Sequence, residues 1–425
     1  MTTAMIITLI IALIMIVLII SDKLAFGAPP LIACVLLVLT GVSTIESAFG
    51  GFVDKNVIMI ACFMIILSAF QKTSLITKVK DVMNSMASRG GYKNYVLMLI
   101  AVMLFANVIS GTGYYVLVLS LAATIPYNKK LPVSKVLLPL GFATAFGGFI
   151  PISAAMMTGI VGSILESSGA PPTTISILSY SGVKGAMAIG FFVWALIGFK
   201  LLPDRPITNE GDALEASKEE VALIPKWKET CIYIALLVTV VGLILLSKLG
   251  DSGYMIPGAA AVFLLVTGCI TFKEVREQIS SPLVLMLAGV IGVANAMSSS
   301  GLTSLVGNAV ADVLGNSASP FLIVLLFSAL TSISACFTGA SFGSLFIFAP
   351  IAISACMAMG YDPTAVALAL TISAWINWFM PIDGLPAMIM GLGKYKLTEF
   401  WKFAVPLYII SILILSVVTP LLFPM

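Results

Sequence analysis

Two short, glycine-rich stretches interrupt long apolar runs and carry groups suited to binding a small ion or an anion. The first contains Ser110, Gly111 and Thr112, and the second runs from Thr338 to Gly343. Where two half-helices end at such a break, free N–H groups attract anions and free carbonyl groups coordinate cations. Small residues also allow helices to pack closely, so a purely structural role is the alternative.

A second pair of interruptions places one acid in an apolar environment. The dipeptide Pro-Ile occurs at 151–152 and at 381–382, followed by Ser153 in the first case and by Asp383 in the second. Asp383 is the only acid predicted near the middle of the membrane, where an ionisable residue is a functional candidate by default. It can either ligate Na⁺ or carry a proton. The structural alternative is a solvated acid at a helix end.

Neither interruption contains Lys or Arg. An anionic substrate would therefore be held by backbone amides, hydroxyl groups and a bound cation, which favours cation-coupled uptake. Asn107 and Asn377 flank the interruptions, and they either take part in such a site or only satisfy backbone groups of the loops. Trp375 and Trp378 are expected to pack rather than to contact substrate.

The composition determines what kind of protein carries these residues. Of 425 residues, 60% are hydrophobic and only 10% are charged, and the mean hydropathy is +1.12. These values indicate an all-α integral membrane protein and exclude a soluble enzyme. The chain contains no His, and its six Cys are scattered singly, so no metal or disulfide framework is expected. Nothing suggests nucleic-acid binding.

Long apolar runs predict the elements that hold the candidate residues. Re-entrant hairpins are expected at 95–126 and 318–350, broken helices at 133–167 and 363–392, and interfacial helices at 74–92 and 300–317. The remaining runs of spanning length lie at about 3–20, 28–45, 56–71, 175–200, 229–248, 255–271, 282–297 and 399–423. The first of these is interpreted as a retained helix rather than a signal peptide.

The order of these elements repeats along the chain. Residues 1–200 and 229–425 each contain three crossings, an interfacial helix, a hairpin, a broken helix and a final helix, and 201–228 is a polar linker. Residues that recur in register include Pro30, Thr40, Gly41 and Thr44, which match Pro257, Thr267, Gly268 and Thr271. Because five crossings per repeat is an odd number, the second repeat is predicted to be inverted.

The basic residues predict the orientation. With the N-terminus outside, all Lys and Arg except Lys55, Lys184 and Lys248 fall in predicted cytoplasmic segments. Both termini are therefore expected to be extracytoplasmic, the linker to be cytoplasmic, and the protein to be a multi-pass protein of the cell (inner) membrane.

Nearly the whole chain resembles the divalent anion/Na⁺ symporter (DASS) family of the ion transporter superfamily. The resemblance runs through FGGFVDKNVIMIACFMIILSAF, LPVSKVLLPLGFATAFGG, SGLTSLVGNAVADVLG and MPIDGLPAMIMGLGKYKLTEFWKFAVPL. It implies a homodimer with inverted repeats that works as an elevator, with Na⁺ sites at the hairpin tips and a carboxylate between them. The family's Ser-Asn-Thr signature is altered here: Gly111 stands at the Asn position, and the second tip reads Ala340, Ser341, Phe342. These departures suggest an altered substrate or coupling ion.

The leading hypothesis is an elevator-type transporter that imports a small anion with Na⁺ across the lipid bilayer. The alternatives are a cation/proton antiporter that uses Asp383, with H⁺ in place of Na⁺, and the membrane subunit of a tripartite transporter that depends on a binding protein. The candidate Na⁺ ligands are Ser110, Gly111, Thr112, Thr338, Gly339, Ala340, Ser341 and Asp383. The candidate substrate contacts are Ser110, Gly111, Thr112, Ser153, Ser341 and Gly384.

Overall fold

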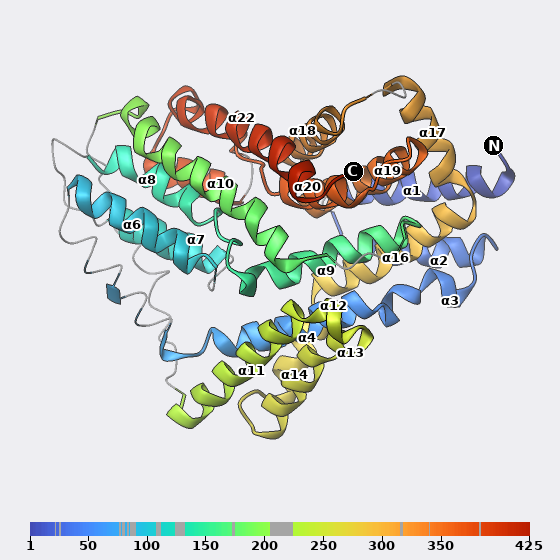
Figure 1. Ribbon diagram of the computed structural model, residues 1–425, viewed down its shortest axis with the longest axis horizontal. Coiled ribbons are helices and arrows are strands. Elements are labelled where there is room, and N and C mark those ends of the chain that lie inside the picture. The colour runs from blue at the N-terminus through green and yellow to red at the C-terminus, as the bar shows by residue number, and fades with distance from the viewer. Residues whose placement is uncertain are drawn as a thin grey trace.

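The computed structural model describes most of the chain, and every regular element in the described part is a helix. The residues outside the description are 22, 25–26, 76–77, 79–80, 83–84, 86–90, 108–111, 124–131, 172–174, 205–223, 315–317, 340 and 382–383. Figure 1 shows the helices stacked in tiers, with α18, α19, α20 and α22 at the top of the view and α4, α11 and α14 at the bottom.

The helices of the first half include one long span, α10, and several shorter apolar ones. In order they are α1 (Thr3–Ser21), α2 (Ala28–Leu39), α3 (Ile45–Ala48), η1 (Gly50–Val53), α4 (Lys55–Phe70), α6 (Tyr92–Phe105), α7 (Thr112–Ala123), α8 (Val133–Ala143), α9 (Pro151–Ser167), α10 (Ile177–Gly198) and η2 (Phe199–Leu201).

The second half repeats this order with longer hairpin helices. It consists of α11 (Lys226–Ile244), α12 (Leu246–Leu249), α13 (Asp251–Tyr254), α14 (Ile256–Val266), α15 (Phe272–Ile279), α16 (Pro282–Ser299), α17 (Leu302–Leu314), α18 (Pro320–Thr338), α19 (Ser341–Ala358), α20 (Thr364–Ser373), α21 (Gly384–Gly393) and α22 (Leu397–Leu422).

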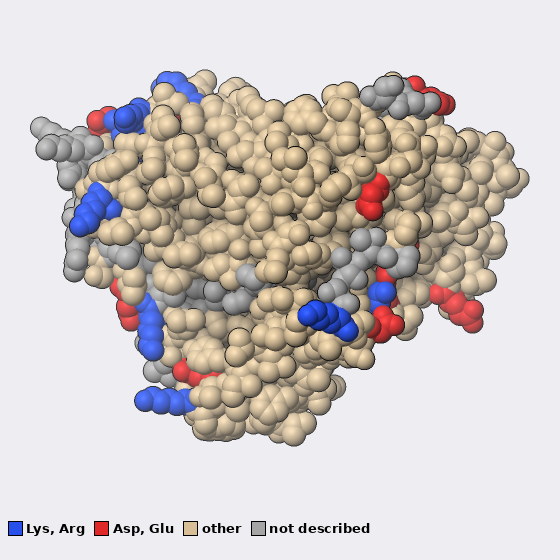
Figure 2. Space-filling model, in the orientation of Figure 1, with Lys and Arg blue, Asp and Glu red and all other residues tan. Residues whose placement is uncertain are grey.

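Several helices have the length and composition needed to cross a bilayer. Within the part of the chain that the structure describes, six helical segments qualify: Ile177–Leu201, Lys226–Ile244, Phe272–Ser299, Pro320–Thr338, Ser341–Ala358 and Leu397–Leu422. Figure 2 shows a broad face almost without charged residues, with Lys and Arg gathered mainly along its left edge. The predicted multi-pass membrane protein is thus confirmed.

Matching residues of the two halves form the same local structure. Thr40 ends α2 and Thr267 ends α14, and each hydroxyl donates to the carbonyl four residues earlier, at 2.8 Å in both cases. The glycines that follow have φ angles of 72° and 67°. Next, Thr44 caps α3 and Thr271 caps α15, in each case by accepting a backbone N–H three residues later. These residues, which recur in register in the sequence, thus form similar helix ends in the two halves.

Helix contacts also occur in matching pairs. Helix α2 packs on α16 while α14 packs on α4, α7 packs on α8 while α19 packs on α20, and α9 packs on α20 while α21 packs on α8. Helices α16 and α3 approach each other closely, because a Cβ on Gly292 would overlap the carbonyl oxygen of Ala48. A Cβ on Gly51 would likewise overlap the carbonyl oxygen of Ala288.

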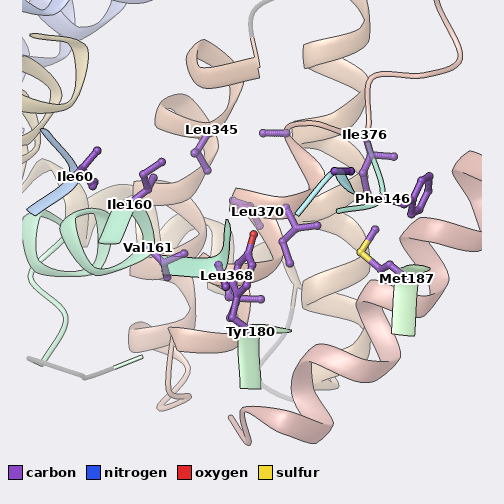
Figure 3. Close-up of a cluster of buried hydrophobic side chains, with 14 of the residues drawn as sticks. Ile60, Phe146, Ile160, Val161, Tyr180, Met187, Leu345, Leu368, Leu370 and Ile376 are labelled. Carbon is purple, nitrogen blue, oxygen red and sulfur yellow. The ribbon is translucent and has the colours of Figure 1, made fainter. Parts of the chain in front are cut away.

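The core lies where the two halves meet. Figure 3 shows buried side chains from five helices and two connecting segments in one cluster: Ile60, Phe146, Ile160, Val161, Tyr180, Met187, Leu345, Leu368, Leu370 and Ile376. All but a few per cent of each side chain's surface is removed from solvent. Burial on this scale fixes the interrupted segments against rigid helices.

The second hairpin is longer than the predicted 318–350. Helix α19 continues through Pro350 to Ala358, and α18 and α19 are each long and apolar enough to span. Proline removes one N–H donor but does not end this helix, and the Ser354 hydroxyl donates to the Pro350 carbonyl at 2.7 Å. In the first half, α6 and α7 lie within one or a few residues of the predicted bounds at 95 and 126. The interfacial piece at 300–317 forms α17, whereas 74–92 is mostly outside the described residues.

Candidate functional site

Both predicted broken helices are interrupted in the structure. Residues 144–150 separate α8 from α9, and 374–383 separate α20 from α21; these two segments are named break 1 and break 2 below. The breaks touch through aromatic side chains, since the ring centroids of Phe146 in break 1 and Trp378 in break 2 are 4.9 Å apart. Two interruptions far apart in sequence thus lie against each other inside the fold.

Break 1 is held by the side chain of one buried asparagine. The Oδ1 atom of Asn107, just beyond the end of α6, accepts the N–H groups of Gly148 at 3.0 Å and Ile150 at 2.8 Å. Its Nδ2 donates to the Met103 carbonyl at 2.8 Å. The side chain therefore joins the end of α6 to break 1. The sequence left open whether Asn107 serves a site or only the loops, and the described contacts are all with backbone groups.

Two glycines in break 1 allow close packing around this asparagine. A Cβ on Gly147 would overlap the carbonyl group of Ala106, and Gly148 has a φ of +93°, which strains any other residue. A Cβ on Gly148 would also lie 2.7 Å from the Cε atom of Lys184. The stem of Lys184 therefore runs directly across break 1.

Break 2 is held by aromatic rings instead. Trp375 meets Phe342 of α19 edge-on at 4.7 Å between centroids, and Phe379 meets Phe337 of α18 at 6.0 Å. The Cys336 thiol also donates weakly to the Ile376 carbonyl at 3.8 Å. The second hairpin is thus packed against break 2, and the prediction that Trp375 and Trp378 serve packing agrees with these contacts.

The predicted site residues that the structure describes lie at helix ends. Thr338 is the last residue of α18 and donates its hydroxyl to the Ser334 carbonyl at 2.8 Å, while Gly339 caps the helix with a φ of 69°. The other described positions each lie at or near the start of a helix: Thr112 in α7, Ser153 in α9, Ser341 in α19 and Gly384 in α21. Four predicted residues lie outside the described residues: Ser110, Gly111, Ala340 and Asp383.

The arrangement brings the second tip and break 2 together. Thr338, Gly339 and Ser341 lie within four positions of the chain, next to Phe342, which contacts Trp375. No cluster of three or more Cys, Asp or Glu that could hold a metal ion is found within the described ranges. A Na⁺ site here would rely on carbonyl and hydroxyl oxygens, as the helix ends provide them.

Sequence reasoning missed Lys184. It is the only charged residue of α10, and the absence of Lys and Arg from both breaks was taken to mean that no cation of the chain lies there. A lysine inside an apolar helix is itself a signal of function, which could have identified it. Its partner segment was not predictable, because the sequence does not tell which face of α10 meets break 1.

Helices interrupted in pairs, with the interruptions in contact inside an apolar helical body, define a membrane transporter. The model of the CitMHS citrate transporter family matches residues 16–346, and the chain belongs to this family. This agrees with the predicted resemblance to the ion transporter superfamily, whose members catalyse transport and are not enzymes.

Two curated relatives are similar over about half of the chain. Both are described as uncharacterized transporters: YfbS of Escherichia coli is 26% identical over 235 residues, or 54% of this chain and 37% of its own. The second, sll0640 of Synechocystis, is 26% identical over 216 residues, or 51% of this chain and 34% of its own. The alignments thus span little more than a third of each relative.

Two solved structures share the fold. The YdaH transporter of Alcanivorax borkumensis gives a TM-score of 0.64 at 16% identity, with 90% of this chain and 88% of that chain covered. MtrF of Neisseria gonorrhoeae, from a class of antimetabolite efflux pumps, gives 0.51 at 12% identity, with 90% and 84% covered.

Proposed function

We propose that this protein is a secondary active transporter that imports a small carboxylate or inorganic anion together with Na⁺. The observation that carries the proposal is the contact of Phe146 with Trp378, which joins two broken helices at matching places in the two halves. Irregular backbone inside a membrane is tolerated where it lines a binding site. The family model that matches this chain is described as a citrate transporter, which supports an anionic substrate.

An inverted repeat accounts best for the paired features of the two halves. The matched caps at Thr40 and Thr267 and the exchanged contacts of α2 with α16 and of α14 with α4 are what a pseudo-two-fold axis in the membrane plane would produce. In this proposal 1–200 and 229–425 are the repeats. The helices around the breaks, α6–α10 and α18–α22, move together as an elevator against the others.

Na⁺ is the proposed coupling ion because the described groups at the second tip are oxygens. Hydroxyl groups of Thr338 and Ser341 and the carbonyl groups at the end of α18 suit a hard cation better than a soft one. Asp383 would add a carboxylate to this site or act as a proton carrier. Asp383→Asn separates the two roles: loss of a Na⁺ ligand weakens Na⁺ dependence at every pH, whereas loss of a proton carrier removes only the pH dependence.

Orientation follows from charge. Lys200 in η2 and Lys226 and Lys228 at the start of α11 flank the linker, and Figure 2 shows most of its Lys and Arg side chains along the left edge. Positive charge favours the cytoplasmic side. We therefore place this edge in the cytoplasm, both termini outside, and the protein in the cell membrane as a homodimer.

The test is a flux assay with the purified protein in liposomes, in which Na⁺ and pH gradients are imposed separately. Uptake of citrate, succinate, sulfate or phosphate that an inward Na⁺ gradient drives is the expected result. Uptake that only a pH gradient drives would show that the coupling ion is H⁺ and not Na⁺. Na⁺ release driven by a pH gradient without any anion would favour the antiporter, and anion export would reverse the proposed direction.

A further inference from the structure

Lys184 lies on the buried face of α10 and not on its lipid face. The buried stripe of the helix runs through Tyr180, Met187 and Phe191, whereas Ile189 and Val193 on the other side are exposed. Lys184 is one turn from Tyr180 and belongs to the buried stripe, with its side chain half-buried. A lysine whose side chain only extended toward the membrane surface would not need to lie on the buried face of α10.

The side chain of Lys184 enters break 1 through a gap that glycine leaves. Its Cγ, Cδ and Cε atoms all lie within 3.6 Å of where a Cβ of Gly148 would be. Two turns further along the same stripe, Phe191 stacks on Phe146 of break 1 with 4.2 Å between ring centroids. The face of α10 that carries Lys184 is therefore the face that covers break 1.

The ammonium group has no acid beside it in the part of the chain that the structure describes. No described carboxylate lies within ion-pair distance of Lys184, whereas Lys55, Lys72 and Lys135 each have one. The neighbouring N–H groups of Gly148 and Ile150 donate hydrogen bonds to Asn107. As donors, they cannot accept a hydrogen bond from the ammonium group of Lys184. A positive charge without an acid beside it, close to the N-terminal end of α9, attracts an anion.

We propose that Lys184 binds the anionic group of the substrate, a carboxylate or an inorganic oxyanion, at break 1. This inference rests on the proposed function and names the residue that recognises the charge of the substrate. It also changes the expectation that only backbone amides, hydroxyls and a bound cation would do so. Because an ammonium group repels Na⁺, the coupling ion binds elsewhere.

The experiment measures thermal unfolding of the purified full chain with citrate, succinate, sulfate or phosphate as sodium salts, against NaCl at equal Na⁺ and ionic strength. Wild type is expected to be stabilised by at least one of these anions. Lys184→Met should weaken the apparent affinity for that anion by at least about tenfold, because a charge-assisted contact is lost. Lys184→Arg should retain part of it. The control is Lys200→Met at the exposed end of the same helix segment, which should bind like wild type.

A second readout separates binding from a structural role. If Lys184 serves the substrate, replacing a half-buried ammonium that has no carboxylate partner among the described residues by apolar Met should raise the unfolding temperature in NaCl alone. A structural lysine would give the opposite change. Lys184→Gln takes the place of Lys184→Met if the latter does not fold.

The outcomes distinguish this inference from the proposed function. If wild type transports an anion with Na⁺ and Lys184→Met does so with unchanged anion affinity, the inference is wrong and the proposed function stands. If Lys184→Met loses anion affinity but keeps its Na⁺ affinity, both stand. If none of the four anions stabilises wild type or is transported, both are wrong.

Discussion

The two breaks occupy matching places in the two halves but are built from different chemistry. Break 1 is fixed by hydrogen bonds from Asn107 to two backbone N–H groups, and Lys184 lies across it. Break 2 is fixed by ring contacts of Trp375, Trp378 and Phe379 with their neighbours. Break 1 is thus polar and has a lysine beside it, whereas break 2 is held mainly by aromatic side chains. The difference suggests that break 1 serves the anion and that the second tip serves the coupling cation.

The aromatic side of this comparison predicts the largest loss of stability. Trp378 is only 4% exposed and contacts both Phe142 and Phe146. Trp378→Ala should lower the free energy of unfolding by about 3–5 kcal/mol, because it leaves a large cavity between the breaks. Chemical denaturation in detergent measures this. Trp227→Ala, at a side chain that is 53% exposed, is the control and should change stability by less than about 0.5 kcal/mol. Equal effects of the two substitutions would show that the breaks do not depend on this contact.

The hydrogen bonds that Asn107 makes to break 1 predict a slightly smaller loss of stability. Asn107→Ala leaves the N–H groups of Gly148 and Ile150 without their acceptor, which should cost about 2–4 kcal/mol and abolish transport. Asn377→Ala, at the flanking asparagine of break 2, should cost less than about 1 kcal/mol. Asn377 is half-buried, and the structure gives its side chain no hydrogen bond to the residues that it describes. Thermal unfolding measures both variants. Equal destabilisation of the two would contradict the view that only break 1 is held by an asparagine side chain.

How much of this could be read from the sequence depends on whether a feature is local. The interruptions before Pro151 and before Gly384 and the helix ends at Thr40 and Thr267 follow from Pro, Gly and Thr at short range. The contact of Phe146 with Trp378 and the passage of Lys184 over Gly148 depend on how helices rotate about their axes. The extension of α19 past Pro350 was missed because tertiary packing overrides the local preference against proline. The roles of all the predicted ligands remain predictions, and four of these residues, Ser110, Gly111, Ala340 and Asp383, lie outside the described residues.

A glycine in or beside each break allows the two breaks to be compared by single substitutions. Gly148 and Gly384 both have positive φ angles, +93° and +58°, but only at Gly148 would a Cβ meet another residue, Lys184. Gly384→Ala should therefore cost only the backbone strain, about 1–2 kcal/mol. Gly148→Ala should cost about 1 kcal/mol more and should weaken anion binding as well, since it displaces the lysine. Unfolding and anion-binding measurements test this, and anion binding that is weakened equally in both variants would argue against a special role of Gly148.

The smallest expected effect on stability concerns the far end of the first broken helix. Glu166 in α9 pairs with Lys55 at the start of α4, with 2.8 Å between Nζ and Oε1, and also accepts Nδ2 of Asn56 at 3.3 Å. The side chains are 36% and 30% exposed, so Lys55→Met should change stability by less than about 1 kcal/mol. The pair nevertheless joins α9, proposed to move, to α4, proposed to stay fixed.

A movement of α9 past α4 has to break this pair, so its removal should alter the rate of transport far more than the stability. If the pair stabilises the resting state by about 0.5–1 kcal/mol, Lys55→Met should speed the conformational step by about twofold to fivefold. Initial uptake rates in liposomes measure this, with Lys273→Met as the control, since Lys273 pairs with Glu277 inside α15 alone. Glu166→Gln should have the same effect, and the double variant should add little to it. Unchanged rates in all three variants would mean that α9 and α4 do not move relative to each other during transport.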